Sequence, residues 1–219
     1  RVSTRHTARA WPAWKIDIGL ACWMAAVLAG LGLLFHTGPF ANSYAPHFVA
    51  QAQAWLQGRL DVTGMLGHHD TVLHNGLQYI VYPPLPAVLM LPFVALLGSS
   101  FSDIWFTWII GIVNVLLVFH LLDLMRQRGW SPRTQRENVV LAALFGTGTV
   151  ALWLAMEGGV WFTSQTVAIT FLLLMIIATI RERWWLASLA LGLILLTRST
   201  DVVAGIFVLA FFARSLGNN

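Results

Sequence analysis

The residues best suited to chemistry are gathered in one polar stretch, His36 to Tyr82, which interrupts a very hydrophobic chain. This stretch contains Asp61, Asp70 and five of the seven histidines of the protein. A carboxylate in such a segment can take a proton from a hydroxyl group as a general base. Asp70 is our first candidate for that role and Asp61 is the second. The structural alternatives are a turn residue for Asp70, and a cap or a partner of Arg59 for Asp61.

Imidazole groups in the same stretch raise the possibility of a metal site. His68, His69, Asp70 and His74 carry the ligand types that suit Zn²⁺ or Mn²⁺. We take His69 and His74 as the candidate ligands, for a divalent ion such as Mn²⁺ or Mg²⁺. Adjacent residues rarely hold one ion together, so a solvated cluster in a loop is the competing interpretation. Cysteine ligands are excluded because Cys22 stands alone in a hydrophobic segment.

Basic and phenolic side chains provide candidate contacts for a phosphate group. Arg198 follows an apolar segment, and a guanidinium can bind phosphate through two parallel hydrogen bonds. The alternative is an arginine that extends to lipid headgroups or pairs with Asp201. Arg59 and Tyr82 are further candidates for the same contact.

The composition excludes a soluble protein. Hydrophobic residues make up 58% of the 219 residues and charged residues only 10%, against about 25% in soluble domains. The net charge of +4 is clustered, and no basic stripe alternates with exposed aromatic residues, which argues against nucleic-acid binding. The sequence therefore predicts an all-α, polytopic integral membrane protein.

About six hydrophobic segments are expected to cross the bilayer, which requires about 20 apolar residues per helix. They are residues 16–35, 104–124, 139–156, 160–180, 184–196 and 202–212. Segment 84–97 is apolar but short and contains Pro86 and Pro92, so we expect a re-entrant segment or a short span. Together with the loop 36–83, these segments are expected to form one membrane domain, residues 1–219.

An amphipathic helix is predicted inside the loop 36–83. Between Tyr44 and Leu60, the apolar residues are spaced so that they share one helical face. We expect this helix to lie on the membrane surface, with Pro46 in its first turn and Gly58 as its C-cap. An ordinary amphipathic helix packed on a neighbouring domain is the alternative.

Basic residues form four clusters, at Arg1–Lys15, Arg126–Arg136, Arg181–Arg183 and Arg214. Cytoplasmic loops of membrane proteins are enriched in Lys and Arg. If all four clusters are cytoplasmic, segment 84–97 does not traverse and the loop 36–83 is extracytoplasmic. The N-terminus is then cytoplasmic, and residues 157–159 and 198–201 lie on the outer side near the loop.

The order of several motifs resembles that of a known family. The motifs are Gln51–Asp61, His69-Asp70, Asn75–Ala87, Leu91-Pro92-Phe93 and Gly192–Thr200. They resemble bacterial polytopic glycosyltransferases of the GT-C superfamily, near the protein O-mannosyltransferase-like and aminoarabinose-transferase-like branches. The chain departs from that pattern at Asn42-Ser43, where many members carry an acidic residue, and at Ser199, which replaces a proline.

The resemblance implies an enzyme of the bacterial inner membrane that transfers a sugar from a polyprenyl-phosphate donor to an acceptor on the outer side. Asp70 or Asp61 would be its base, and Arg198, Arg59 and Tyr82 would contact the lipid phosphate. Its partners would be the donor lipid, the bilayer and other membrane subunits, with no nucleic acid. Family members are usually longer, so we expect an incomplete or truncated chain. The alternative function is a non-catalytic GT-C-like subunit of a larger membrane complex.

Overall fold

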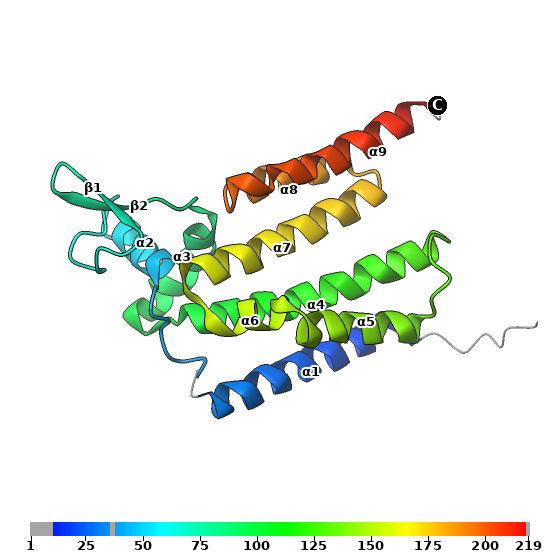
Figure 1. The fold of residues 1–219 in the computed structure, drawn as a ribbon, viewed down its shortest axis with the longest axis horizontal. Helices are drawn as coiled ribbons and strands as arrows, with labels where there is room; N and C mark the ends of the chain where they lie inside the picture. Colours follow the sequence, from blue (N-terminus) through cyan, green and yellow to red (C-terminus); the bar gives the residue numbers. More distant parts are fainter. Residues whose placement is uncertain (1–10, 36–37, 218–219) are drawn as a thin grey trace, which may run out of the picture.

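The computed structural model describes residues 11–35 and 38–217. His36 and the first ten residues of the basic cluster Arg1–Lys15 therefore lie outside the described residues. The described chain is a bundle of helices with a cap of shorter elements at one end (Figure 1). In chain order the elements are α1 (Ala13–Leu34), α2 (His47–Leu56), β1 (Thr71–His74), β2 (Leu77–Ile80), α3 (Leu85–Leu97), η1 (Gly98–Ser100), α4 (Asp103–Gln127), α5 (Gln135–Gly148), α6 (Val150–Glu157), α7 (Gly159–Ile180), α8 (Trp184–Leu195), η2 (Ser199–Ala204) and α9 (Gly205–Gly217).

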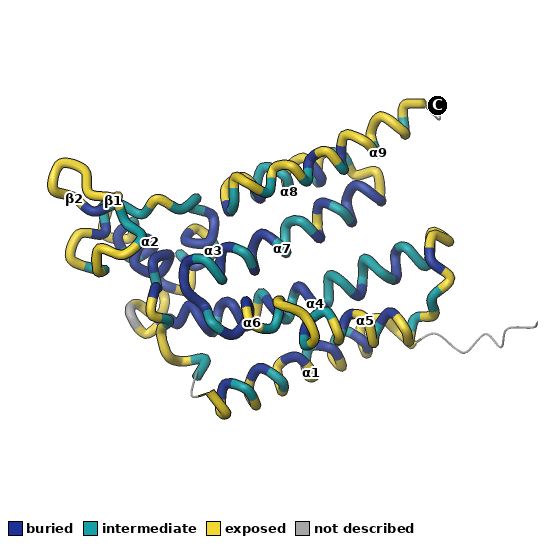
Figure 2. The backbone as a smooth tube through the Cα atoms, viewed as in Figure 1, coloured by how far each residue is buried: buried dark blue, intermediate teal, exposed yellow. Residues whose placement is uncertain are grey.

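Four stretches of the described chain are long and apolar enough to cross a membrane. They are α1, α4, α7 and the continuous stretch Ser199–Gly217, which consists of η2 and α9. The central helix, α4, packs against α1, α5, α6 and α7. Burial follows this arrangement, because the buried backbone lies mainly along α4, α7 and the cap, while α9 is largely exposed (Figure 2). The protein thus has the helical architecture of a multi-pass membrane protein.

The segment expected as one span at 139–156 is instead divided into α5 and α6, which are bent by 56° relative to each other. Thr149 lies at the break with an extended backbone, and its hydroxyl accepts a hydrogen bond of 3.1 Å from the amide of Ala151. Gly146 and Gly148 precede the break, and glycine weakens a helix. Counting the bent pair as one span gives up to five such stretches, while α8, with 12 residues, is a shorter apolar helix.

The two ends of the bundle differ in character. At the basic end, the starts of α1 and α5 are joined by reciprocal hydrogen bonds between the backbone of Trp11 and the side chain of Gln135. The ends of α4, α7 and α9 lie at this same end, so the described parts of the four basic clusters are found at one end of the bundle (Figure 1). At the opposite, loop end, the cap meets the starts of α4 and α7. This is the relative arrangement expected from the sequence.

The predicted amphipathic helix forms as α2 and is largely buried. Seven of its residues are buried, and it packs against α3 and α7. Other elements of the same chain therefore cover most of the helix, and its position at the membrane surface stays a prediction. Its apolar residues, including Phe48 and Val49, share a hydrophobic cluster with Met90 of α3 and Val160 of α7.

The ends of α2 agree with the sequence pattern. Pro46 is the N-cap residue, and Gly58 follows the C-cap with a φ of 72°, a conformation that glycine adopts without a steric penalty. The amide of Gly58 donates to the carbonyl of Trp55 at 3.0 Å, and the amide of Arg59 donates to the carbonyl of Ala54 at 2.8 Å. These two bonds form a Schellman motif, which satisfies the last carbonyl groups of the helix.

A small β-hairpin adds strand structure to the expected all-α fold. Strands β1 and β2 are antiparallel, and Asn75 and Gly76 connect them with φ values of 50° and 78°. Positive φ at both central residues is the requirement of a type I′ turn, for which Asn-Gly is the preferred pair. The hairpin therefore follows from a local signal that a purely helical interpretation of the loop overlooks.

Both ends of α3 lie at the loop end of the bundle. The amide of Leu85 donates to the carbonyl of Leu196 at 2.9 Å. Beyond the other end of α3, Phe101 joins the hydrophobic cluster of α2, and the hydroxyl of Ser102 donates to the carbonyl of Ala41. This placement agrees with a segment that does not traverse the bundle.

Buried polar side chains join α4 to α7. The hydroxyls of Thr107 and Thr163 are 2.9 Å apart. Asn114 donates to the carbonyl of Thr166 at 2.9 Å and accepts from the hydroxyl of Thr170 at 2.7 Å. Hydrogen bonds of this kind link helices where water is absent.

Candidate functional site

Asp103, the first residue of α4, joins three segments at the loop end. Its side chain is buried, with 2% exposure. Oδ1 accepts a hydrogen bond of 2.9 Å from the amide of Ser43, and Oδ2 accepts from the Ser43 hydroxyl and, at 2.9 Å, from the amide of Gly159. A carboxylate with this many donors orders the segments around it.

Asp103 was not among the site residues expected from the sequence. From the beginning of α4, it places a carboxylate beside Ser43, in the chain that follows α1. The sequence signal for this contact was only an acidic residue in the first turn of a helix, which more often stabilises the helix N-terminus.

Asp61 and Arg59 bind each other in the loop that follows α2. Nη2 of Arg59 lies 2.7 Å from Oδ1 of Asp61, and the amide of Thr63 donates to the same oxygen at 3.1 Å. The hydrogen bonds from Arg59 and Thr63 hold the pKa of Asp61 well below its usual range. Both charged groups are therefore engaged in shaping the loop.

Asp70 differs from Asp61 because no arginine neutralises it and one of its oxygens is buried. Oδ2 meets no hydrogen-bond criterion with any residue that the structure describes, but Nε2 of His69 lies at ion-pair distance, 3.3 Å away, and the side chain of Tyr82 is adjacent. The backbone of Asp70 has a φ of 55°, in the left-handed region that only a few non-glycine residues occupy. Buried polar atoms are nearly always paired, and left-handed backbone often marks functional positions.

Aromatic side chains lie beside His69 and Tyr82, the two residues next to the Asp70 carboxylate. Trp161, in the first turn of α7, donates a hydrogen bond from Nε1 to the hydroxyl of Tyr82. The ring of His69 meets Trp161 edge-on with centroids 5.6 Å apart, and the ring of Tyr44 lies 6.4 Å from Trp161. We refer to His69, Asp70, Tyr82 and Trp161 as the Asp70 site.

The backbone at the Asp70 site is held by α2. Nε2 of His47, at the beginning of α2, donates to the carbonyl of His69 at 2.9 Å. Because α2 is itself buried against α3 and α7, this bond fixes the loop that carries Asp70 to the helix bundle. A carboxylate on a loop anchored in this way keeps a defined position, which a general base requires.

The pKa of Tyr82 is higher than that of an exposed tyrosine. Burial raises its pKa, and the adjacent Asp70 charge raises it further, whereas the hydrogen bond from Trp161 acts in the opposite direction. The hydroxyl therefore keeps its proton at neutral pH and is available as a donor.

Arg198 lies at the loop end, and its closest acidic partner is Asp201. Nε of Arg198 is 3.5 Å from Oδ2 of Asp201, and both side chains are partly exposed. The backbone contact between Leu196 and Leu85 ties this corner to the chain that follows Tyr82. Arg198 and the Asp70 site thus belong to the same end of the bundle.

The two candidate metal ligands have different neighbours. His74 ends β1, where its Nε2 is 3.2 Å from Nδ2 of Asn75, while His69 packs against Trp161. Within residues 11–35 and 38–217, no group of three or more His, Cys, Asp or Glu side chains could hold a metal ion.

The contributions of Trp161, Tyr44 and His47 to the site were not predicted from the sequence. Trp161 has the pattern of a tryptophan at the end of a span, which usually indicates an interfacial anchor. Its contact with Tyr82 joins residues 79 positions apart. No local signal identifies such a pair.

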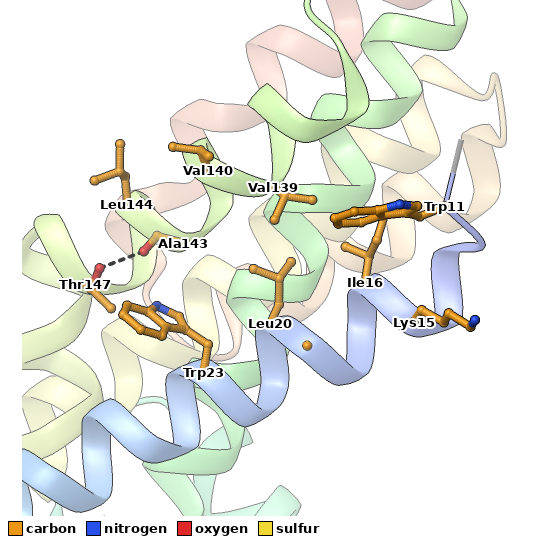
Figure 3. A pocket seen from close by; sticks show the side chains of 11 residues that line it. Trp11, Lys15, Ile16, Leu20, Trp23, Val139, Val140, Ala143, Leu144 and Thr147 are labelled. Carbon is orange, nitrogen blue, oxygen red and sulfur yellow. Dashed lines mark hydrogen bonds between the residues drawn. The ribbon is translucent and has the colours of Figure 1, made fainter. Parts of the chain in front are cut away.

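A groove of about 390 Å³ lies elsewhere, between α1 and α5 (Figure 3). Its walls are almost entirely apolar, with Leu20 and Trp23 on one side and Val140 and Leu144 on the other. Trp11 and Lys15 line the part of the groove that is nearest the basic end. It contains no carboxylate, so it does not compete with the Asp70 site as a place for chemistry.

A scan against protein-family models, a search of curated proteins and a search of solved structures found no significant match for the chain.

Proposed function

We propose that the protein is a membrane glycosyltransferase of the GT-C type, which transfers a sugar from a polyprenyl-phosphate donor to an acceptor hydroxyl on the extracytoplasmic side. The observation that carries the proposal is the Asp70 carboxylate, which has one buried oxygen and lies beside the side chains of His69 and Tyr82. The proposal includes a bacterial inner membrane, with the basic end of the bundle in the cytoplasm.

The proposed reaction assigns one role to each group. Oδ2 of Asp70 takes the proton of the acceptor hydroxyl while the oxygen of that hydroxyl attacks the anomeric carbon of the sugar. The bond from this carbon to the phosphate oxygen breaks, and the polyprenyl phosphate leaves with the electron pair. Tyr82 donates a hydrogen bond within the site, and Arg198 neutralises charge on the departing phosphate.

The decisive experiment measures sugar transfer in membranes from radiolabelled polyprenyl-phosphate sugars. Asp70→Asn is expected to reduce the transfer rate by roughly 100-fold or more at an unchanged protein level. Asp61→Asn makes the same chemical change in the same loop, but its carboxylate is occupied by Arg59 and Thr63, so transfer is expected to persist. Loss in Asp61→Asn with full activity in Asp70→Asn would overturn the assignment of the base.

A second candidate function is a non-catalytic GT-C-like subunit of a membrane complex. The stretch Ser199–Gly217 favours it, because only 11% of its apolar window is buried inside the described chain. Its outer face is therefore left for lipid or another protein. Absence of transfer from every donor, with stoichiometric co-purification of another membrane protein, would support the subunit.

A further inference from the structure

A second groove, of about 230 Å³, lies between α7 and α8, and two arginines line one end of it. Its walls are apolar and include Phe171 and Leu174 of α7 and Leu189 and Leu193 of α8. Leu174 and Leu189 are 39% and 53% exposed, so the groove is open along its side. A lateral opening on a membrane helix pair admits a hydrocarbon chain directly from the bilayer.

Two guanidinium groups belong to this groove. Arg181 and Arg183 line it where α7 ends and α8 begins, at the basic end of the bundle. Neither side chain forms an ion pair with any residue in the described part of the chain. Their charge is therefore available to an anion at the level of the lipid headgroups.

The acidic residue between the two arginines is directed elsewhere. Glu182 has a φ of 57°, in the left-handed region, and it lines a different crevice of about 210 Å³ together with Arg128 and Arg214. The reversal of the chain at Glu182 thus separates its carboxylate from Arg181 and Arg183. No Asp or Glu is among the described residues that line the groove between α7 and α8.

We propose that this groove binds one acyl chain of an anionic phospholipid, whose phosphate is held by Arg181 and Arg183. Basic pockets between membrane helices on the cytoplasmic side recognise anionic headgroups, and guanidinium groups match phosphate geometry. The apolar walls and the paired arginines recognise the two halves of the same molecule. The site is separate from Asp70 and does not rest on the proposed transferase activity.

The test uses the full chain purified in detergent and native mass spectrometry with two lipids of identical acyl chains, phosphatidylglycerol and phosphatidylcholine. The wild type is expected to retain one phosphatidylglycerol molecule roughly tenfold better than phosphatidylcholine. The double variant Arg181→Gln/Arg183→Gln is expected to lose this preference. Leu189→Trp, at an exposed position of the groove, is expected to reduce retention of both lipids because it fills part of the hydrocarbon site.

The matched control is Arg128→Gln/Arg214→Gln, which removes the same charge from the neighbouring crevice that contains Glu182. It is expected to keep the preference for phosphatidylglycerol. Equal loss in both double variants would mean that general surface charge attracts the lipid, and would overturn the proposal. Survival of the preference in Arg181→Gln/Arg183→Gln would overturn it too, as would displacement of the lipid by an equal concentration of inorganic phosphate. Melting temperatures of all variants confirm that they are folded.

Discussion

The amide of Gly159, at the beginning of α7, donates a hydrogen bond of 2.9 Å to Oδ2 of Asp103, at the beginning of α4. The same carboxylate binds the backbone and the hydroxyl of Ser43, which follows α1. One buried side chain therefore fixes the relative positions of three chain segments at the loop end. The Asp70 site depends on this arrangement because Trp161 lies in the same first turn of α7.

Asp103→Asn is expected to destabilise the protein. An amide offers one acceptor oxygen instead of two, and its NH₂ group would face a donor, so at least one buried group loses its partner. The expected cost is about 2–3 kcal/mol, or a melting temperature lower by roughly 5–10 °C in detergent. Asp201→Asn, at a partly exposed carboxylate, is the control and should change the melting temperature by only about 1–2 °C. An unchanged melting temperature in Asp103→Asn would contradict the role of Asp103.

Gly111→Ala is expected to force α4 away from α6. A Cβ atom at Gly111 would lie 2.6 Å from the Cβ of Ala155, which is closer than two carbon atoms that are not bonded to each other can approach. The expected destabilisation is about 1–3 kcal/mol, seen as a lower melting temperature. Gly192→Ala in α8 makes the same change where nothing lies within 4 Å, so it should be neutral or slightly stabilising. A comparable loss in both variants would show that the close contact between α4 and α6 is not the cause.

Tyr82 is expected to ionise at a higher pH than an ordinary tyrosine. Because its pKa is raised in the folded protein, the associated stability is fully present below about pH 10 and is lost as the pH rises through the folded value. Absorbance of phenolate can be followed, since the chain has only three tyrosines. Tyr82→Phe should remove the part of the absorbance change above the ordinary range.

The Asp70→Asn variant tests whether the Asp70 charge contributes to the raised pKa of Tyr82. Removal of the negative charge should lower the pKa of Tyr82, but only in part, because burial is the larger cause of its shift. A Tyr82 titration identical in the wild type and in Asp70→Asn would contradict the contact between the two side chains.

Hydrophobicity predicts the long helices well because the bilayer core sets their length. The segment expected at 160–180 is α7, Gly159–Ile180, and the segment expected at 104–124 is α4, Asp103–Gln127. The break at Thr149 was not predicted, because a hydroxyl between two apolar stretches does not by itself end a helix. The sequence also left open whether lipid or protein covers α2, since an apolar face looks the same in both cases.

The candidate site also contains some residues that the sequence predicts and others that it does not. His69, Asp70 and Tyr82 are all in the loop, where polar residues stand out against an apolar chain, and the structure brings them together. Trp161 and Asp103 reach the loop end from distant helices, so their contacts depend on tertiary packing. Arg59 and Asp61 have suitable chemistry, but a contact between the two side chains satisfies them locally.

The hydrogen bonds between α4 and α7 join two helices that are synthesised at different times. Asn114 is 52 residues before its partner Thr166, so α4 is made before α7 is complete. During that interval the amide of Asn114 lacks the partner that it has in the finished bundle, and an unpaired amide in hydrocarbon is costly. Arrival of α7 removes this cost and locks the two helices together. The late helix therefore completes the folding of the early one.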